Sequence, residues 1–245
     1  MKRDHILREM GLGPVWKLRT PPAAMPVEQV AVAATAAAAT LQAPIAPSLP
    51  GTSNAPLAAM AWEELAAAVA ACRACRLCEA RKQAVFGVGD RDADWLFVGE
   101  GPGAEEDARG EPFVGQAGKL LDNMLAAIGL KRGEDVYIAN AVKCRPPENR
   151  TPAPEETAAC RPYLERQIEL IRPKLIVALG RPAAQTLLQT DIKIAAARGR
   201  LHDYRGIPLI VTYHPAYLLR TLQDKAKAWE DLCFMRRTMR ARKDS

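Results

Sequence analysis

Short apolar runs alternate with longer segments of helical spacing between residues 94 and 242. Four of these runs have the length and composition of buried strands, and they lie at 94–100, 135–142, 174–180 and 208–214. The segments with helical spacing lie at 115–129, 152–171, 181–189 and 224–242. Strands that alternate with helices favour an α/β fold with three layers, α/β/α, around a mostly parallel central sheet.

The polar motifs of the chain fall where the predicted strands end. "GEGPG" (99–103) follows the first strand, Asn140 ends the second, and His214 ends the last. In parallel sheets of this kind, ligands bind at the carboxyl ends of the strands. We therefore expect these three segments to meet in one site.

The N-terminal part of the chain lacks this alternation. Residues 21–60 contain seven prolines and many alanines, and Glu28 is their only charged residue. A segment with so little to pack is typical of a flexible, disordered linker. It would separate an amphipathic peptide at 1–20 from a globular domain at 61–245, which is long enough to form a single core.

Charge and hydropathy indicate the setting in which the protein works. The net charge of +6 and the pI near 9.1 are consistent with a polyanionic partner. The first residues lack the apolar segment of a secretory signal, and no apolar run approaches the ~18 residues that span a bilayer. These features predict a cytoplasmic protein without membrane contact, whose thiols stay reduced.

Three of the six cysteines, Cys72, Cys75 and Cys78, fall within seven positions, and Cys144 and Cys160 follow downstream. A C-x2-C pair alone fits a zinc site, a redox pair or no ligand at all. The fifteen residues between the later two cysteines do not match the spacing of a second zinc knuckle. Four thiolates from distant segments can also hold an iron–sulfur cube, and composition leaves iron and zinc open.

The glycine-rich stretch "VGEGPGA" (98–104) fits the G-x-G-x-x-A pattern of dinucleotide-binding loops. We reject that interpretation because Pro102 interrupts the turn and three acidic residues follow where a pyrophosphate would need a helix N-terminus. Two interpretations remain: an ordinary turn after a strand, or a loop that gives a planar ligand close access to the backbone.

Three side chains near these strand ends allow both a structural and a functional interpretation. Most lone histidines are structural, but the position of His214 at a strand end favours a functional role. A buried amide such as that of Asn140 needs partners, which are either backbone groups or a ligand. Phe113 is either a core residue or a stacking platform on a glycine-rich loop.

Taken together, several motifs resemble those of the family 4 uracil-DNA glycosylases, iron–sulfur enzymes of bacteria and archaea. They appear in family order from about Trp62 to Met235, as "CRACRL", "FGVGD", "VGEGPGAEEDARGEPFVGQAGKLLD", "VYIANAVKCRPPENRTP" and "TYHPAYLLR". The resemblance implies the uracil-DNA glycosylase fold in a bacterial protein. It also implies hydrolysis of the N-glycosidic bond of deoxyuridine in DNA, which releases uracil and leaves an abasic site.

The resemblance also implies roles for individual residues. Phe113 would stack on a flipped-out uracil, the Asn140 amide would read its edge, and His214 would donate to O2 as negative charge develops. Either Glu100 or Glu106 would orient water or shape the pocket near the 5-position of the base. The implied catalytic residues are Glu100, Asn140 and His214, and the implied base-binding residues are Gly99, Glu100, Gly101, Pro102, Gly103, Glu106, Phe113, Asn140 and His214.

By the same resemblance, a [4Fe-4S] cluster would be held by Cys72, Cys75, Cys144 and Cys160. Cys78 matches no ligand position of the family, and Cys233 resembles a small core residue. The implied DNA contacts are Leu218 or Leu219 as a wedge, with Arg220, Lys143, Arg145 and Arg150 at phosphates.

Two other functions are alternatives to a glycosylase that turns over. A relative in the same superfamily traps uracil-DNA irreversibly through a histidine on a "KRRIH"-like loop, whereas "AARGRLHDYRG" here contains His202 but no such run. A non-catalytic DNA-binding module is a second alternative, and the presence of Glu100, Asn140 and His214 argues against it.

Residues 1–20 carry apolar residues and Trp16 on a basic peptide. Such a peptide is either a tail that folds back on the domain or a docking motif on a tether. "LREMGLGPVWKLRTP" resembles the N-terminal peptide by which the psi subunit of bacterial DNA polymerase III docks onto chi. This resemblance implies a replisome or single-strand-binding component as a partner.

Overall fold

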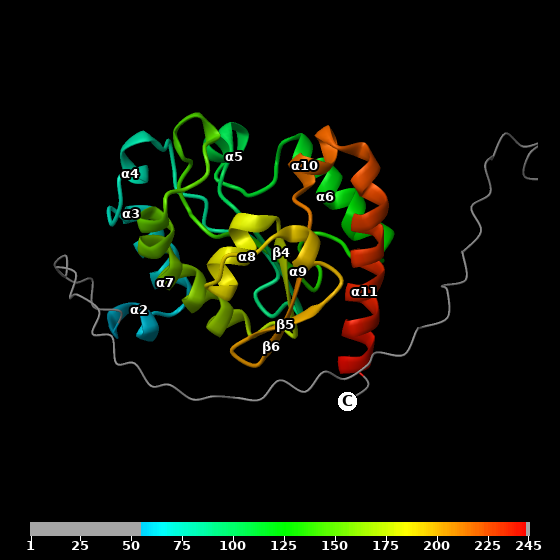
Figure 1. The fold of residues 1–245 in the computed structure, drawn as a ribbon. Coiled ribbons are helices and arrows are strands. Elements are labelled where there is room, and N and C mark those ends of the chain that lie inside the picture. The colour runs from blue at the N-terminus through cyan, green and yellow to red at the C-terminus, as the bar shows by residue number, and fades with distance from the viewer. Residues whose placement is uncertain (1–54, 244–245) are drawn as a thin grey trace, which may run out of the picture. The chain divides into compact units, whose positions relative to one another are not determined.

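The computed structural model describes residues 55–243, and a six-stranded sheet lies at their centre (Figure 1). The predictions for residues 1–20 and for the linker up to residue 54 lie outside the described residues. The strands are β1 (Val88–Gly89), β2 (Trp95–Gly99), β3 (Val136–Asn140), β4 (Leu175–Leu179), β5 (Leu201–Tyr204) and β6 (Ile207–Thr212). They are ordered β1-β3-β2-β4-β6-β5 across the sheet.

The helices surround this sheet, and short 3₁₀ turns complete the connections. The described helices are α2 (Ala55–Ala59), α3 (Trp62–Ala71), α4 (Leu77–Ala80), α5 (Ala104–Arg109), α6 (Gln116–Ala127), α7 (Pro154–Ile171), α8 (Arg181–Leu188), α9 (Ile194–Ala197), α10 (Pro215–Arg220) and α11 (Lys225–Lys243). The 3₁₀ turns are η1 (Pro147–Asn149) and η2 (Leu222–Asp224). Within residues 55–243, none of the helices combines the length and the apolar character that crossing a membrane requires.

Strands β2, β3, β4 and β6 run parallel, and β1 and β5 pair with them antiparallel at the two edges. The four parallel strands are the four apolar runs of the sequence, so the prediction of a mostly parallel sheet is confirmed. Neither edge strand was predicted. Strand β1 has only two residues, and β5 reads LHDY, which has no apolar run.

Two separate apolar cores cover the two faces of the sheet. Along β2, Trp95 and Phe97 pack into the core with α6, α10 and α11, whereas Leu96 and Val98 pack into the core with α7, α8 and α9. Figure 1 shows α11 and α6 on one side of the sheet and α7 and α8 on the other. The central strands are buried on both faces, which explains their continuous rather than alternating hydrophobicity and confirms the three-layer prediction.

The domain begins earlier than the sequence predicted. Helix α2 lies inside the segment 21–60 that was predicted to be linker, and it packs against α7. Arg166 donates from Nε and Nη2 to the Met60 carbonyl oxygen, at 2.9 and 2.8 Å. The linker prediction is therefore wrong for residues 55–60. The small residues of "APLAAM" gave no helical pattern that could have revealed it.

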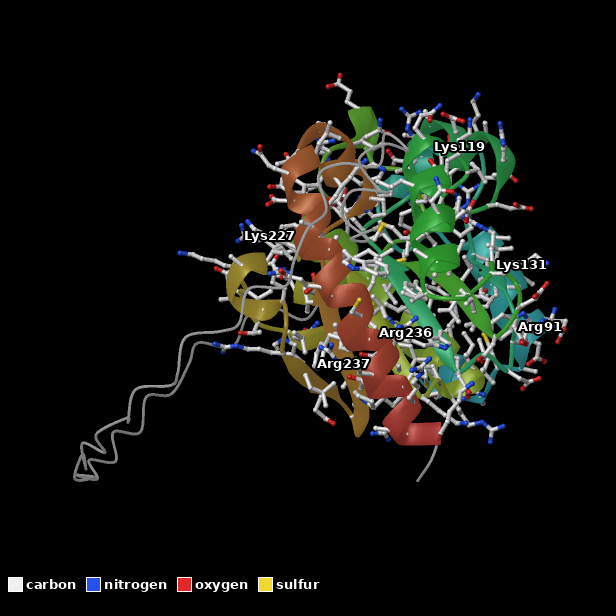
Figure 2. All side chains as sticks on the ribbon, turned by 90° about the vertical axis from the view of Figure 1, so that its right-hand side faces the viewer. Arg91, Lys119, Lys131, Lys227, Arg236 and Arg237 are labelled. Carbon is white, nitrogen blue, oxygen red and sulfur yellow. The ribbon has the colours of Figure 1, made fainter. Side chains whose placement is uncertain are left out.

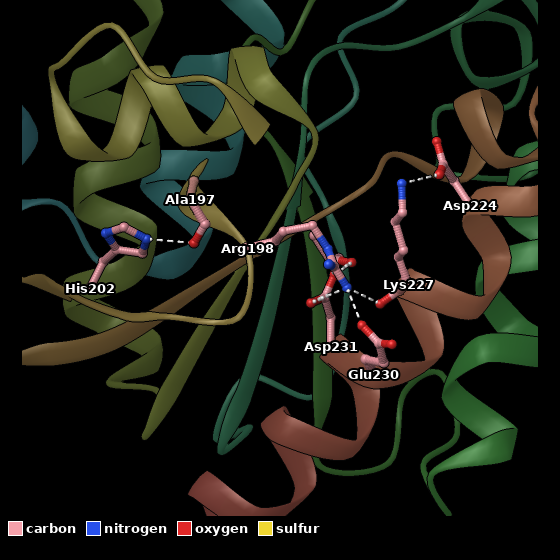
Figure 3. Close-up of polar contacts among 8 residues, drawn as sticks. Ala197, Arg198, His202, Asp224, Lys227, Glu230 and Asp231 are labelled. Carbon is pink, nitrogen blue, oxygen red and sulfur yellow. Dashed lines mark hydrogen bonds and ion pairs between the residues drawn. The ribbon is translucent and has the colours of Figure 1, made fainter. Parts of the chain in front are cut away.

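A buried ion pair fixes α11 to the sheet (Figure 3). The Asp231 side chain is 1% exposed, and its carboxylate accepts from Thr212 Oγ1 of β6 at 2.8 Å and from Arg198 Nε at 3.2 Å. The Arg198 guanidinium also reaches the exposed carboxylate of Glu230 at 3.1 Å. Because β6 leads directly to His214, this contact helps to define where that histidine lies.

Replacing Asp231 with alanine should lower the free energy of unfolding by about 3 kcal/mol, because it leaves Arg198 and the Thr212 hydroxyl without their buried partner. Glu230→Ala is the matched control, because Glu230 lies on the same helix and pairs with the same arginine, Arg198. Its carboxylate is 69% exposed, so a loss within about 1 kcal/mol is expected. Urea unfolding followed by circular dichroism measures both values, and equal losses would contradict the assignment.

Candidate active site

A cleft of about 670 Å³ opens at the carboxyl ends of β2, β3 and β6. All of the predicted base-binding residues except Gly99 line this cleft: Glu100, Gly101, Pro102, Gly103, Glu106, Phe113, Asn140 and His214. The three polar segments of the sequence therefore meet in one place, as the topology of a parallel sheet requires.

The ring of Phe113 is held at the cleft by a strained main chain. Its φ of 56° is uncommon for a bulky residue. Arg132 stabilises this conformation by donating to the Pro112 and Phe113 carbonyl oxygens, each at 2.8 Å. The loop lies so close to α6 that a Cβ atom at Gly118 would stand 1.7 Å from the Phe113 oxygen. The Phe113 ring consequently faces His214, with 5.4 Å between ring centroids and a tilt of 30°.

The amide of Asn140 lacks a partner for its oxygen. The residue is 2% exposed, and Oδ1 is buried without a hydrogen bond. Gly99 lies beside it in the parallel ladder, and a Cβ atom there would stand 2.4 Å from Oδ1 and 2.7 Å from the Phe113 ring. Gly99 therefore makes room for both side chains rather than lining the cleft. Because buried polar atoms are normally paired, the free oxygen indicates a place for a ligand donor.

His214 is held as a neutral hydrogen-bond donor. It precedes α10, and its Nδ1 accepts from the Ala216 main-chain N–H at 3.1 Å. Burial, together with the charge of Arg220, lowers the pKa of His214 to about 4. With Nδ1 occupied as an acceptor, the single proton of the neutral ring resides on Nε2. The histidine can thus donate a hydrogen bond into the cleft at neutral pH.

The two acidic candidates have different surroundings. Both oxygens of Glu106 accept from main-chain N–H groups: Oε1 from Val114 and Gly115, at 3.0 and 3.2 Å, and Oε2 from Gly103 at 3.1 Å. Glu106 therefore ties the glycine-rich loop to the Phe113 loop. Burial raises the pKa of Glu100, and a hydrogen bond from Thr151 only partly offsets that rise. Of the two carboxylates, Glu106 bonds to the main chain of two loops, whereas Glu100 has only the hydrogen bond from Thr151 among the contacts described.

Two of the predicted DNA contacts are wrong. Lys143 is 1% exposed, and its ammonium group donates inward to the Asn140 carbonyl and to Gln167. Leu218 is also 1% exposed and belongs to the apolar core under α10. Neither side chain can reach a nucleic acid, because packing turned both of them inward. The neighbouring Leu219 is 41% exposed and stays available as a wedge.

Arginines stand on the rim of the cleft. Arg220 and Arg150, both predicted as phosphate contacts, line it together with Arg181. Arg150 is also paired with Glu156 through two short contacts of 2.7 and 2.6 Å. Arg145 donates to Asn149 at 2.8 Å on the same loop.

Basic side chains are not confined to this rim. Figure 2 shows Lys227, Arg236 and Arg237 along α11, and Lys119 stands on α6 of the same layer. The net charge of the chain is therefore spread over several surfaces. The case for a polyanion at the cleft rests on the three rim arginines and not on the total charge.

The sequence did not single out several cleft residues. Tyr213 and Tyr217 flank His214 and stack on each other with 5.2 Å between centroids, and Arg181 follows the end of β4. The rule that sites lie at the carboxyl ends of strands could have indicated Arg181. For the tyrosines, the signal was their position next to His214 within "TYHPAYLLR".

A second, small cavity collects cysteines from three segments. Its lining includes Cys72, Cys75, Cys78, Cys144 and Cys160. The fold therefore brings together the four predicted cluster ligands, and Cys78 lies beside them. Among the described residues, no group of three or more His, Cys, Asp or Glu side chains is arranged to hold a metal ion.

The chemistry of this donor set fits an iron–sulfur cluster. Arg81 donates to the Cys144 sulfur at 2.8 Å, and the Lys143 main-chain N–H donates to the Cys160 sulfur at 3.2 Å. Hydrogen bonds of this kind to thiolate sulfurs accompany such clusters and tune their potential. Burial raises the pKa of the Cys144 thiol and raises that of Cys160 to about 12. Binding of such a cluster as thiolates would release the protons of these thiols.

Comparison with known proteins agrees with this geometry. The family model for the uracil DNA glycosylase superfamily matches residues 86–233. The chain is 52% identical over 143 residues to the type-4 uracil-DNA glycosylase of Archaeoglobus fulgidus. This alignment covers 55% of this chain and 71% of that protein. The chain is also 49% identical over 149 residues to the type-4 uracil-DNA glycosylase of Thermotoga maritima. That alignment covers 60% of this chain and 77% of the Thermotoga protein.

A third relative, the type-4 uracil-DNA glycosylase of Pyrobaculum aerophilum, is 44% identical over 161 residues, covering 62% of this chain and 81% of that protein. Each alignment covers more than two thirds of the relative. The chain therefore belongs to the type-4 branch of the uracil DNA glycosylase superfamily.

Proposed function

We propose that this protein is a uracil-DNA glycosylase, which hydrolyses the N-glycosidic bond of deoxyuridine in DNA during base excision repair. The free oxygen of the Asn140 amide is the observation that carries this proposal. It lies buried in a cleft that is also lined by the aromatic ring of Phe113 and by His214, a neutral donor. A planar base with both donor and acceptor groups on its edge can stack on the ring, bond to the amide and accept from the histidine.

Recognition of uracil follows from the two ends of one amide. Asn140 Oδ1 accepts from the N3–H of uracil, and Nδ2 donates to O4. Cytosine presents the reverse pattern, so it would leave buried polar groups unpaired, a mismatch that rejects an analogue by roughly 10⁴ or more. Phe113 stacks on the face of the base, which must be flipped out of a duplex before it enters the cleft.

His214 lowers the barrier to bond cleavage. As the bond between N1 of uracil and C1′ of the sugar breaks, its electron pair leaves with the base, and negative charge builds on O2. The Nε2–H of a neutral imidazole donates to that oxygen and stabilises the departing anion. The water that adds to C1′ gives up one proton, which passes through solvent to the departing uracil anion, and we assign the orientation of this water to Glu100.

We assign a [4Fe-4S] cluster to Cys72, Cys75, Cys144 and Cys160. Hydrolysis transfers no electron, so a bound cluster supplies a covalent anchor that joins three chain segments beside the cleft. This chain contributes Arg81 and the main chain of Lys143 as hydrogen-bond donors to the sulfurs.

Alanine at Asn140 or at His214 should reduce single-turnover cleavage by about 10²–10³-fold, because each variant lacks one preorganised group of the pocket. The assay uses a single-uracil oligonucleotide followed by alkali, which cuts the strand at an abasic site. Arg220→Ala is the control on the rim. It should weaken DNA binding and reduce its salt dependence while single-turnover chemistry changes less.

Normal turnover by both alanine variants would refute the pocket assignment. A stable covalent adduct with the wild-type protein would indicate a trapping relative instead of a glycosylase. Binding without cleavage or adduct would leave only a DNA-binding module.

Serine at Cys144 or Cys160 should abolish the brown colour and the broad visible absorbance expected of an iron–sulfur protein, together with most of the soluble yield. Cys78→Ser is the matched control, since it removes a thiol from the same cavity, and it should keep the colour. Iron per chain, measured on the purified proteins, distinguishes the variants. Loss of iron from Cys78→Ser but not from Cys75→Ser would overturn the ligand set.

The N-terminal peptide is assigned a docking role toward a replisome or single-strand-binding component. A tether of the length of residues 21–54 would raise the local concentration of the enzyme where uracil appears in DNA. Support for this role comes only from the sequence of residues 1–20, which lie outside the described residues.

Deleting residues 1–50 should leave turnover of a short oligonucleotide unchanged, because α2 and the rest of the domain are retained. An isolated peptide of residues 1–20 should bind purified chi, and Trp16→Ala should abolish that binding. Loss of solubility or turnover on deletion would place the peptide in the core and end the docking assignment.

A further inference from the structure

Lys143 is a fully buried cation that the mechanism above does not use. Its Nζ donates to the main-chain oxygen of Asn140 at 2.9 Å and to Gln167 Oε1 at 2.6 Å. Within the described residues, no carboxylate forms an ion pair with it. A lysine that is 1% exposed and bonded to neutral oxygens is costly to bury, so its position requires an explanation beyond packing.

The explanation lies in how β3 ends. The Ala141 N–H bonds to the Gly99 oxygen of β2, and adjacent residues of a strand direct their main-chain groups to opposite sides. The Asn140 oxygen therefore faces away from β2, toward the edge where β1 lies. Strand β1 pairs only with Ile138 and Tyr137, so it supplies no donor at Asn140.

Two side chains fill this gap in the ladder. Gln167 Nε2 donates to the Phe86 oxygen at 3.0 Å, and its Oε1 receives the Lys143 ammonium, which in turn donates to the Asn140 oxygen. The chain of contacts from Phe86 through Gln167 and Lys143 to Asn140 replaces the missing strand pairing. Its last contact, from the Lys143 ammonium to the Asn140 oxygen, is the one that holds the main chain of the residue whose amide reads the base, whereas Gln167 joins that ammonium to Phe86.

The main chain of Lys143, at the opposite end of the residue from its ammonium group, is held at the cysteine cavity. Its main-chain N–H donates to the Cys160 sulfur at 3.2 Å, and its oxygen accepts from Val85 N–H at 2.8 Å. Cys144 is the next residue in the chain. Lys143 thus touches both the cysteine site and the strand end that carries Asn140.

We propose that Lys143 is a positioning residue for base recognition, which holds Asn140 in register by bonding its main-chain oxygen from the loop of the cysteine site. This inference rests on the proposed function, because it concerns the same pocket. Lys143 touches no substrate and acts only through Asn140. Its loss should therefore reduce discrimination of the base more than it reduces general affinity for DNA.

The test compares affinities for two oligonucleotides that differ in a single nucleotide. One carries deoxyuridine with a 2′-fluorine, which slows glycosidic cleavage, and the other carries thymidine. Lys143→Met, purified with its iron, should lower the ratio of the two affinities at least tenfold while binding of the thymidine strand stays within about twofold. Lys143→Gln is too short to reach the Asn140 oxygen but keeps a polar group for Gln167, and it should lower the ratio similarly if the methionine variant does not fold.

Gln167→Met is the matched control. It removes a buried hydrogen bond from the same ammonium group but leaves the contact with Asn140, so the ratio should stay within about threefold of wild type. Iron per chain should be equal in all variants, since the main-chain N–H of residue 143 still faces Cys160. An unchanged ratio in a folded, iron-loaded Lys143 variant overturns the inference, and so does an equal loss in Gln167→Met. A wild-type ratio near one would instead refute the proposed function.

Discussion

The pairing of Gly99 with Asn140 at the ends of two neighbouring parallel strands is the constraint on which the cleft depends. Parallel pairing brings these residues side by side, and the missing side chain at Gly99 leaves space that the Asn140 amide and the Phe113 ring share. Any side chain at position 99 would collide with both groups. The space at this end of the cleft is thus set by the sheet itself, and the surrounding loops complete it.

Those loops are held mainly by charged side chains that bond to main-chain groups. Glu106 binds three N–H groups of two loops, Arg132 binds two carbonyl oxygens at Phe113, and Lys143 binds the carbonyl oxygen of Asn140. Hydrogen bonds with a charged partner are stronger than neutral ones, so a few of them can define an irregular backbone. Glu106, Arg132 and Lys143 therefore hold in place the main chain that carries the groups of the cleft.

The sequence was most informative where burial imposes a pattern. The four central strands were predictable because both of their faces are covered, whereas β5 has a polar sequence and becomes a strand only by pairing with β6. The position of His214 at a strand end was predictable from topology. The direction of a side chain within a motif was not, since Lys143 and Leu218 look exposed in sequence and are turned inward by packing. The same limit applies to the strained backbone of Phe113, which has no signature in composition.

The ion pair between Arg198 and Asp231 has a consequence for how the protein is made. Helix α11 follows β6 in the chain, and it covers one face of the sheet through Leu232 and Met235 while the Asp231 carboxylate accepts from the Thr212 hydroxyl. During synthesis, β6 and His214 leave the ribosome before the residues that fix them. Until α11 follows, the strand that bears the histidine has an uncovered apolar face and a hydroxyl without its partner. The cleft therefore becomes complete only after α11, which follows β6 in the chain, has been synthesised.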